Sequence, residues 1–196
     1  SNMKIKVCGI TREEDIVKLL ELNVDFIGFN LLKESKRKVD IDWALDMTKK
    51  YQIKDKSVFL VDCEEPDFQS LKNVTSHNLQ IYNFREIPNV SNMLFIPVNA
   101  TFLKHLEKSH LRLNENHRYL VDNMEGALGG TGEKFDWNNL HKLDLSEVML
   151  AGGIGPEDID FLQNLNVWGI DVNSKFEIAP GQKNHNLLES LRNINE

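Results

Sequence analysis

The 196-residue sequence is poor in cysteine, with only Cys8 and Cys63, which lie far apart and outside any CxxC pattern. A disulfide framework is therefore not expected, and both thiols are predicted to be reduced. The six histidines show no ligand spacing such as HxxxH. We accordingly predict no metal site and no cofactor.

Long hydrophobic runs are also missing. No apolar stretch approaches the roughly 20 residues that cross a bilayer, and the N-terminus lacks the basic-then-apolar layout of a signal peptide. We therefore expect a cytoplasmic protein with no membrane partner. Positive charge is scarce as well, because 23 Lys and Arg face 30 Asp and Glu, a net charge of -7. Nucleic-acid binding needs clustered cations, so no nucleic-acid partner is expected.

The composition is that of an ordinary globular domain, with 41% hydrophobic and 27% charged residues. No low-complexity tract, long linker or composition break divides the chain. We expect one catalytic domain over residues 3–196. Ser1 and Asn2 precede Met3 and are interpreted as the remnant of an expression tag.

Apolar stretches rich in Val, Ile and Phe alternate with stretches of helical period, which is typical of repeated βα units around a parallel sheet. Eight such strands favour a compact α/β fold, a closed (βα)8 barrel of the TIM class, although these barrels typically have about 250 residues. An open doubly wound sheet is the alternative. The predicted strands are residues 5–10, 26–32, 57–62, 79–83, 94–98, 119–122, 148–152 and 168–172.

Helix signals lie between these strands. Thr11 before a run of acids is expected to cap the first helix, and Asp40 to open the second. The connection over residues 83–94 is short and contains Pro88, so the fourth helix is predicted to be a single turn or absent. Pro66 and Pro156 are expected in the first turns of two more helices, and Leu187, Leu188 and Leu191 on the buried face of the last.

In such a barrel the site lies at the carboxyl ends of the strands. Cys8 lies near the end of the first strand, followed by Gly9, which leaves room for a ligand, and Asp122 ends the sixth. Either residue alone has an ordinary explanation, a core cysteine or a turn-capping aspartate. Together they supply a base and an acid at one barrel mouth, as an isomerase that moves a proton requires.

Three further segments are candidates for ligand binding. Gly152 and Gly153, with Asn173 and Ser174 after the eighth strand, would turn backbone N–H groups toward a phosphate, or form tight turns only. Arg37, within the basic run 33–38, could hold a carboxylate through its planar fork, although such runs are more often a solvated face. Gly129, Gly130, Thr131 and Gly132 are interpreted as a lid over the mouth, or as an ordinary flexible loop.

The motifs together resemble those of phosphoribosylanthranilate isomerases, from residue 4 to the last helix. The similar segments are residues 6–11 (KVCGIT), 25–29 (DFIGF), 35–37 (SKR), 120–122 (LVD), 129–132 (GGTG), 135–137 (FDW), 150–154 (LAGGI) with Pro156 and Glu157, 169–174 (GIDVNS), Glu177 and 180–183 (PGQK).

This resemblance implies that Cys8 is the general base, Asp122 the general acid and Arg37 the ligand of the substrate carboxylate. Asp171, in the GIDVNS segment, is expected to contact the substrate. The implied reaction is the Amadori rearrangement of N-(5-phosphoribosyl)anthranilate in tryptophan biosynthesis. A cysteine base also needs a nearby positive group or helix N-terminus to populate its thiolate.

The chain departs from the family pattern in places. Residues 80–83 read QIYN where the family usually has QLHG, and Lys175 stands where glycine is expected. These departures leave a changed substrate open. The alternatives are a diverged phosphosugar-handling barrel enzyme, which would not need Arg37, and a non-catalytic barrel that binds a phosphorylated ligand. The expected partner is a small phosphorylated substrate, and the chain is expected to be a monomer or a homodimer.

Overall fold

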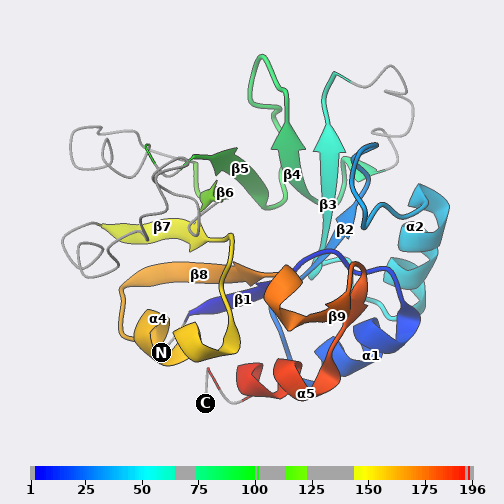
Figure 1. Ribbon diagram of the computed structural model, residues 1–196. Coiled ribbons are helices and arrows are strands. Elements are labelled where there is room, and N and C mark those ends of the chain that lie inside the picture. The colour runs from blue at the N-terminus through cyan, green and yellow to red at the C-terminus, as the bar shows by residue number, and fades with distance from the viewer. Residues whose placement is uncertain are drawn as a thin grey trace.

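Eight parallel strands close into a barrel in the computed structural model, which describes residues 3–64, 74–99, 101, 114–122, 144–192 and 194. Each strand pairs with the next, and β8 pairs back with β1 (Figure 1). The predicted barrel is confirmed, and the open sheet is wrong. The strands are β1 (Lys4–Val7), β2 (Phe26–Asn30), β3 (Ser57–Asp62), β4 (Asn78–Tyr82), β5 (Leu94–Val98), β6 (His117–Val121), β7 (Leu145–Leu150) and β8 (Val167–Val172).

The described helices lie along one side of the barrel, next to β1, β2 and β8 in Figure 1. Residues 83–93 between β4 and β5 form no helix, so the predicted loss of the fourth helix is confirmed. The predicted helix start at Pro66 lies outside the described residues. The helices are α1 (Glu13–Glu21), α2 (Ile41–Lys50), α4 (Ile159–Gln163) and α5 (His185–Leu188), with 3-10 turns η4 (Pro156–Asp158), η5 (Ser174–Phe176) and η6 (Glu189–Leu191).

Helix ends follow the sequence signals with two corrections. The Asp40 side chain accepts from Asp42 N as predicted, and Pro156 opens η4. Thr11 is not the cap of α1: Arg12 holds that position, and the Thr11 hydroxyl donates to Gly181 O instead. Leu188 and Leu191 are buried as predicted, but Leu187 is 36% exposed. The predicted buried face is therefore wrong at Leu187, where α5 has only one turn.

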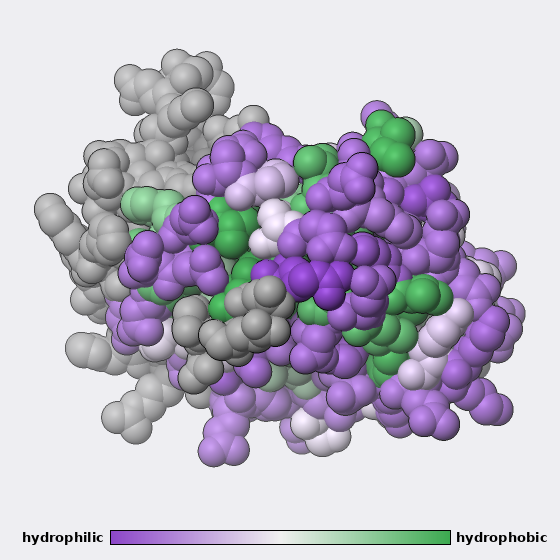
Figure 2. Space-filling model, turned by 90° about the horizontal axis from the view of Figure 1, so that it is seen from below, coloured by the Kyte–Doolittle hydropathy of each residue, from purple (hydrophilic) through white to green (hydrophobic). Residues whose placement is uncertain are grey.

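Two layers of apolar side chains fill the molecule, one between barrel and helices and one inside the barrel. Since successive strand residues point to opposite faces, Val7 packs in the outer layer while Lys6 and Cys8 turn inward. Hydrophilic side chains cover most of the described part of the face shown in Figure 2. The inner layer contains Cys8, Phe26, Val58, Leu60, Phe95, Leu120, Met149 and Ala151.

A short hairpin, β9 (Glu177–Ala179) and β10 (Gln182–Lys183), follows η5 and is tied to α1 by the fully buried Asp15. The Asp15 carboxylate accepts from Arg12 Nε at 3.1 Å and Nη2 at 2.9 Å, and from Lys183 N at 3.1 Å. His185 Nε2 lies 2.7 Å from Asp15 Oδ1. One carboxylate therefore joins the first helix to the C-terminal part of the chain.

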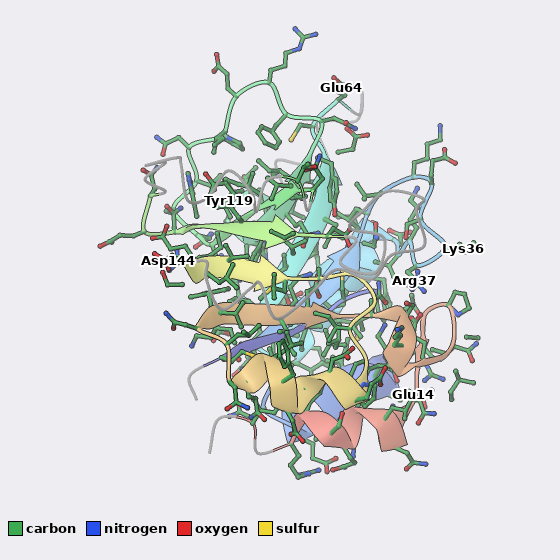
Figure 3. All side chains as sticks on the ribbon, turned by 60° about the vertical axis from the view of Figure 1, so that its left-hand side comes forward. Glu14, Lys36, Arg37, Glu64, Tyr119 and Asp144 are labelled. Carbon is green, nitrogen blue, oxygen red and sulfur yellow. The ribbon has the colours of Figure 1, made fainter. Side chains whose placement is uncertain are left out.

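We expect Asp15→Ala to lower the free energy of unfolding by about 3 kcal/mol, because it removes a fully buried carboxylate and leaves the buried Lys183 N–H and the partly buried Arg12 without their acceptor. Urea unfolding followed by circular dichroism measures the change. The matched control is Glu14→Ala, whose side chain is 64% exposed and lies 3.5 Å from Arg12 (Figure 3). The control should cost less than about 1 kcal/mol. Equal losses in both variants would contradict the role of Asp15.

Candidate active site

A cavity of about 510 Å³ opens at the carboxyl ends of the strands. It brings together every predicted site residue that the structure describes, and the predicted lid, residues 129–132, lies outside the described part. Asn30, Gln80 and Tyr82 also line the cavity. The sequence did not predict Asn30 in the wall, and it did not predict how the Gln80 and Tyr82 side chains are oriented. The predicted residues in the wall are Cys8, Arg37, Asp122, Gly152, Gly153, Asp171, Asn173 and Ser174.

Two glycines near Cys8, which is 4% exposed, allow neighbouring side chains to pack closely. A Cβ on Gly28 of the adjacent strand would lie 2.8 Å from the Cys8 sulfur, so that strand must have glycine there. Gly9 has φ +73°, and a Cβ there would lie 2.5 Å from Arg37 Cδ. The space beside Gly9 is therefore filled by Arg37 rather than left open for a ligand, which corrects the interpretation from sequence.

Lys6 and Asp171 form a buried ion pair directly below Cys8. Lys6 Nζ donates to Asp171 Oδ2 at 2.8 Å, and both side chains are almost fully buried. Burial tends to lower the pKa of Lys6, but the charge and hydrogen bond of Asp171, together with the charges of Cys8 and Tyr82, outweigh it, so the pKa is raised and the amine stays charged. Burial raises the pKa of Asp171 even though Lys6 opposes the shift. Asp171 Oδ1 has no hydrogen-bond partner within the described structure.

The charges around Cys8 indicate what supports its thiolate. Burial raises the pKa of the thiol, and Asp171 raises it further. Lys6 and Lys183 act against this shift through their positive charge. Two buried lysines, Lys6 of β1 and Lys183 of β10, therefore stabilise the Cys8 thiolate. Burial still keeps the pKa of Cys8 above its ordinary value.

Arg37 is anchored by Glu177, which the sequence analysis gave no role. Arg37 Nε lies 3.0 and 3.1 Å from the two Glu177 oxygens, and Nη2 lies 2.6 Å from Oε1. Burial acts to raise the pKa of Glu177, but hydrogen bonds from Arg37 and Lys183 outweigh it and the pKa is lowered. In Figure 3, Arg37 lies beside the segment after β8, while Lys36 lies farther out.

A guanidinium has two edges that can each hold a carboxylate. Glu177 occupies the edge formed by Nε and Nη2 of Arg37. The other edge, with Nη1 and the second N–H of Nη2, has no hydrogen-bond partner among the described residues, and Arg37 lines the cavity. The Arg37 guanidinium is thus held by Glu177 at one edge, and its other edge is unpaired among the described residues.

The candidate anion loops lie on the wall formed by β7 and β8. Gly152 and Gly153 have φ of 82° and 71°, a backbone conformation that disfavours side chains. Asn173 Oδ1 accepts from Lys183 Nζ at 2.8 Å, and the same amine lies 2.9 Å from Glu177 Oε2. The loop after β8 is therefore joined to the Arg37 anchor by one buried lysine.

We expect the Cys8 thiol to titrate above its ordinary pKa of 9.0, because burial disfavours the thiolate more than the lysines favour it. With the pKa raised, the thiol form predominates at neutral pH and thiolate grows only as pH rises through the shifted value. Thiolate absorbance in a Cys63→Ser background measures it, with Cys8→Ser in that background as the blank. A Cys8 thiolate signal already complete at neutral pH would contradict the raised pKa.

The chain matches the family model for N-(5'-phosphoribosyl)anthranilate (PRA) isomerase over residues 5–193. It is 32% identical to N-(5'-phosphoribosyl)anthranilate isomerase of Caldanaerobacter subterraneus subsp. tengcongensis, covering 96% of both chains. It is 30% identical to the tryptophan biosynthesis protein TrpCF of Yersinia pestis, over 91% of this chain and 38% of that protein.

The fold is shared with solved structures. A monomeric form of the dimeric phosphoribosylanthranilate isomerase of Thermotoga maritima superposes with a TM-score of 0.71, at 20% identity and 96% coverage of both chains. The enzyme from Thermus thermophilus gives 0.70 at 23% identity, again over 96% of both chains. The chain belongs to the N-(5'-phosphoribosyl)anthranilate isomerase family.

Proposed function

We propose that the chain catalyses the Amadori rearrangement of N-(5-phosphoribosyl)anthranilate to 1-(2-carboxyphenylamino)-1-deoxyribulose 5-phosphate, a step of tryptophan biosynthesis. One observation carries the proposal: Cys8, Asp122 and Arg37, from three separate parts of the chain, line a single cavity. A base, an acid and a carboxylate fork are the groups that this reaction and this substrate need.

The two anionic ends of the substrate would fix its orientation. The anthranilate carboxylate would bind the open edge of Arg37, since a planar fork pairs with a carboxylate through two parallel hydrogen bonds. The phosphate would bind backbone N–H groups of Gly152 and Gly153 together with Asn173 and Ser174, where barrels commonly hold phosphate. The ribose would then span the space between Cys8 and Asp122.

The chemistry divides between the two side chains. Asp122 gives its proton to the ribose ring oxygen as the bond from that oxygen to the first carbon breaks, which leaves an open-chain protonated imine. The Cys8 thiolate takes the proton from the second carbon, and the electron pair moves to form the neutral enolamine. Loss of the proton on the second carbon's hydroxyl and gain of one at the first carbon give the aminoketone product.

Membership of a biosynthetic enzyme family supports a proposed cellular setting. None of the helices within the described ranges is long and apolar enough to cross a membrane. We propose that the enzyme works in the cytoplasm on a small phosphorylated substrate, as a monomer or homodimer, and without nucleic acid.

Cys8→Ser should retain substrate binding while turnover falls by orders of magnitude, because a hydroxyl is a far poorer base than a thiol. The loss of substrate fluorescence reports turnover, and Cys63→Ser is the matched control that should leave it unchanged. Turnover that survives Cys8→Ser would reassign the base. Absence of turnover in the unmodified protein would instead favour the diverged-substrate or binding-barrel alternatives.

Arg37→Ala should weaken kcat/KM by at least about tenfold, because charge-assisted hydrogen bonds contribute about 1.5 to 3 kcal/mol each. Arg37→Lys should restore only part of it, since a lysine offers a point charge rather than a fork. The matched control replaces Lys36 and Lys38 with Ala, because both side chains are exposed. If the lysines matter and Arg37 does not, the carboxylate assignment fails.

A further inference from the structure

The fourth strand contributes a polar pair that the proposed mechanism does not use. Gln80 and Tyr82 are two residues apart on β4, so both side chains point to the barrel interior, and both line the cavity. Gln80 is only 2% exposed. Residues 80–83 are also where the chain departs from the motif that it otherwise resembles, with Tyr82 in place of the usual histidine.

The two side chains are bonded to each other in a way that leaves both incomplete. Gln80 Nε2 donates to the Tyr82 hydroxyl oxygen at 2.7 Å. Tyr82 therefore accepts within the pair, and its own O–H hydrogen is not used by any described residue. Gln80 Oε1 is buried and has no hydrogen-bond partner in the described structure. One donor and one acceptor thus remain unpaired side by side in the two residues that line the cavity.

The surroundings place this pair at the reacting centre. Burial raises the pKa of Tyr82 to about 12, and the charges that act on the phenol are those of Cys8, Lys6 and Asp122. The hydroxyl therefore keeps its proton across the physiological range and remains a donor. It also lies within electrostatic reach of both the proposed base and the proposed acid.

The unpaired Gln80 oxygen and the Tyr82 O–H determine which chemical group can bind between them. Buried polar groups are costly unless a partner satisfies them, so an unpaired amide oxygen next to an unused O–H calls for a group that donates and accepts at once. A carboxylate or phosphate only accepts, and an ammonium only donates. An alcohol hydroxyl does both, and the sugar of the proposed substrate carries hydroxyls.

We propose that Gln80 and Tyr82 form a subsite for a ribose hydroxyl of the substrate, which donates to Gln80 Oε1 and accepts from the Tyr82 O–H between Cys8 and Asp122. The subsite rests on the proposed function, which it deepens. It holds the sugar rather than either anionic end, so Tyr82 and Gln80 are substrate-positioning residues. A trapped water molecule filling the same opening is the competing explanation.

Binding of ribose 5-phosphate, compared with inorganic phosphate, tests the subsite independently of turnover. Calorimetric titration of the full chain should show Tyr82→Phe and Gln80→Met each weakening ribose 5-phosphate by about three- to tenfold, as the loss of one hydrogen bond predicts. Phosphate affinity should stay unchanged. The double variant should lose less than the product of the two single losses, because the residues act as a pair.

Kinetics complete the test. With the proposed substrate, Tyr82→Phe should lower kcat/KM to the same extent, while the urea midpoint of each variant shows whether it folds. Unchanged ribose 5-phosphate binding in both folded variants would overturn the subsite and leave the water explanation. Equal weakening of phosphate and ribose 5-phosphate would also overturn it. Failure of the proposed function would appear differently, as no turnover in the unmodified protein whatever the binding result.

Discussion

Closure of the barrel between its first and last strands is the constraint on which the site depends. β1 pairs with β8 so that Lys6 lies opposite Asp171, and the ion pair between them joins residues 165 apart in sequence. Neither group would be stable there alone, because an unpaired charge in a barrel interior loses its hydration. Since Cys8 follows Lys6 by two residues, the same closure fixes the thiol above the pair.

A second set of charges holds the rim of the cavity. Glu177 binds Arg37 and Lys183, and Lys183 also binds Asn173, so three segments that follow different strands share one buried network. Long cationic side chains lose considerable entropy when they are ordered. In this network that cost falls on folding rather than on ligand binding, which leaves Arg37 preorganised for a carboxylate.

The sequence predicted the strands well because hydrophobic runs and their turn signals are local. β3 and β5 have the predicted bounds, and the missing helix after β4 follows from a short connection with Pro88. Lys6 could have been found too, since strand alternation places it on the same face as Cys8. Glu177 could not, because its contact with Arg37 spans 140 residues and depends on the hairpin. The prediction that Thr11 caps the first helix was wrong because its hydroxyl donates to the carbonyl of Gly181, which is distant in sequence.

The pattern of satisfied and unsatisfied groups describes the ligand. The three buried cations at the mouth, Lys6, Arg37 and Lys183, already contact two carboxylates, Asp171 and Glu177, so much of their positive charge is paired within the protein. What remains is directional: one edge of Arg37, and the acceptor oxygens Gln80 Oε1 and Asp171 Oδ1. A wall with the Arg37 fork at its rim and buried, unpaired acceptors at its base fits a molecule that is anionic at its periphery and hydroxylated at its centre. A flat aromatic acid alone, or free phosphate alone, would leave those acceptors unpaired, whereas a ligand hydroxyl that pairs with one of them would gain a hydrogen bond on binding. In the proposed complex, the sugar-facing part of the wall would therefore discriminate between ligands, while the charged parts would set their orientation.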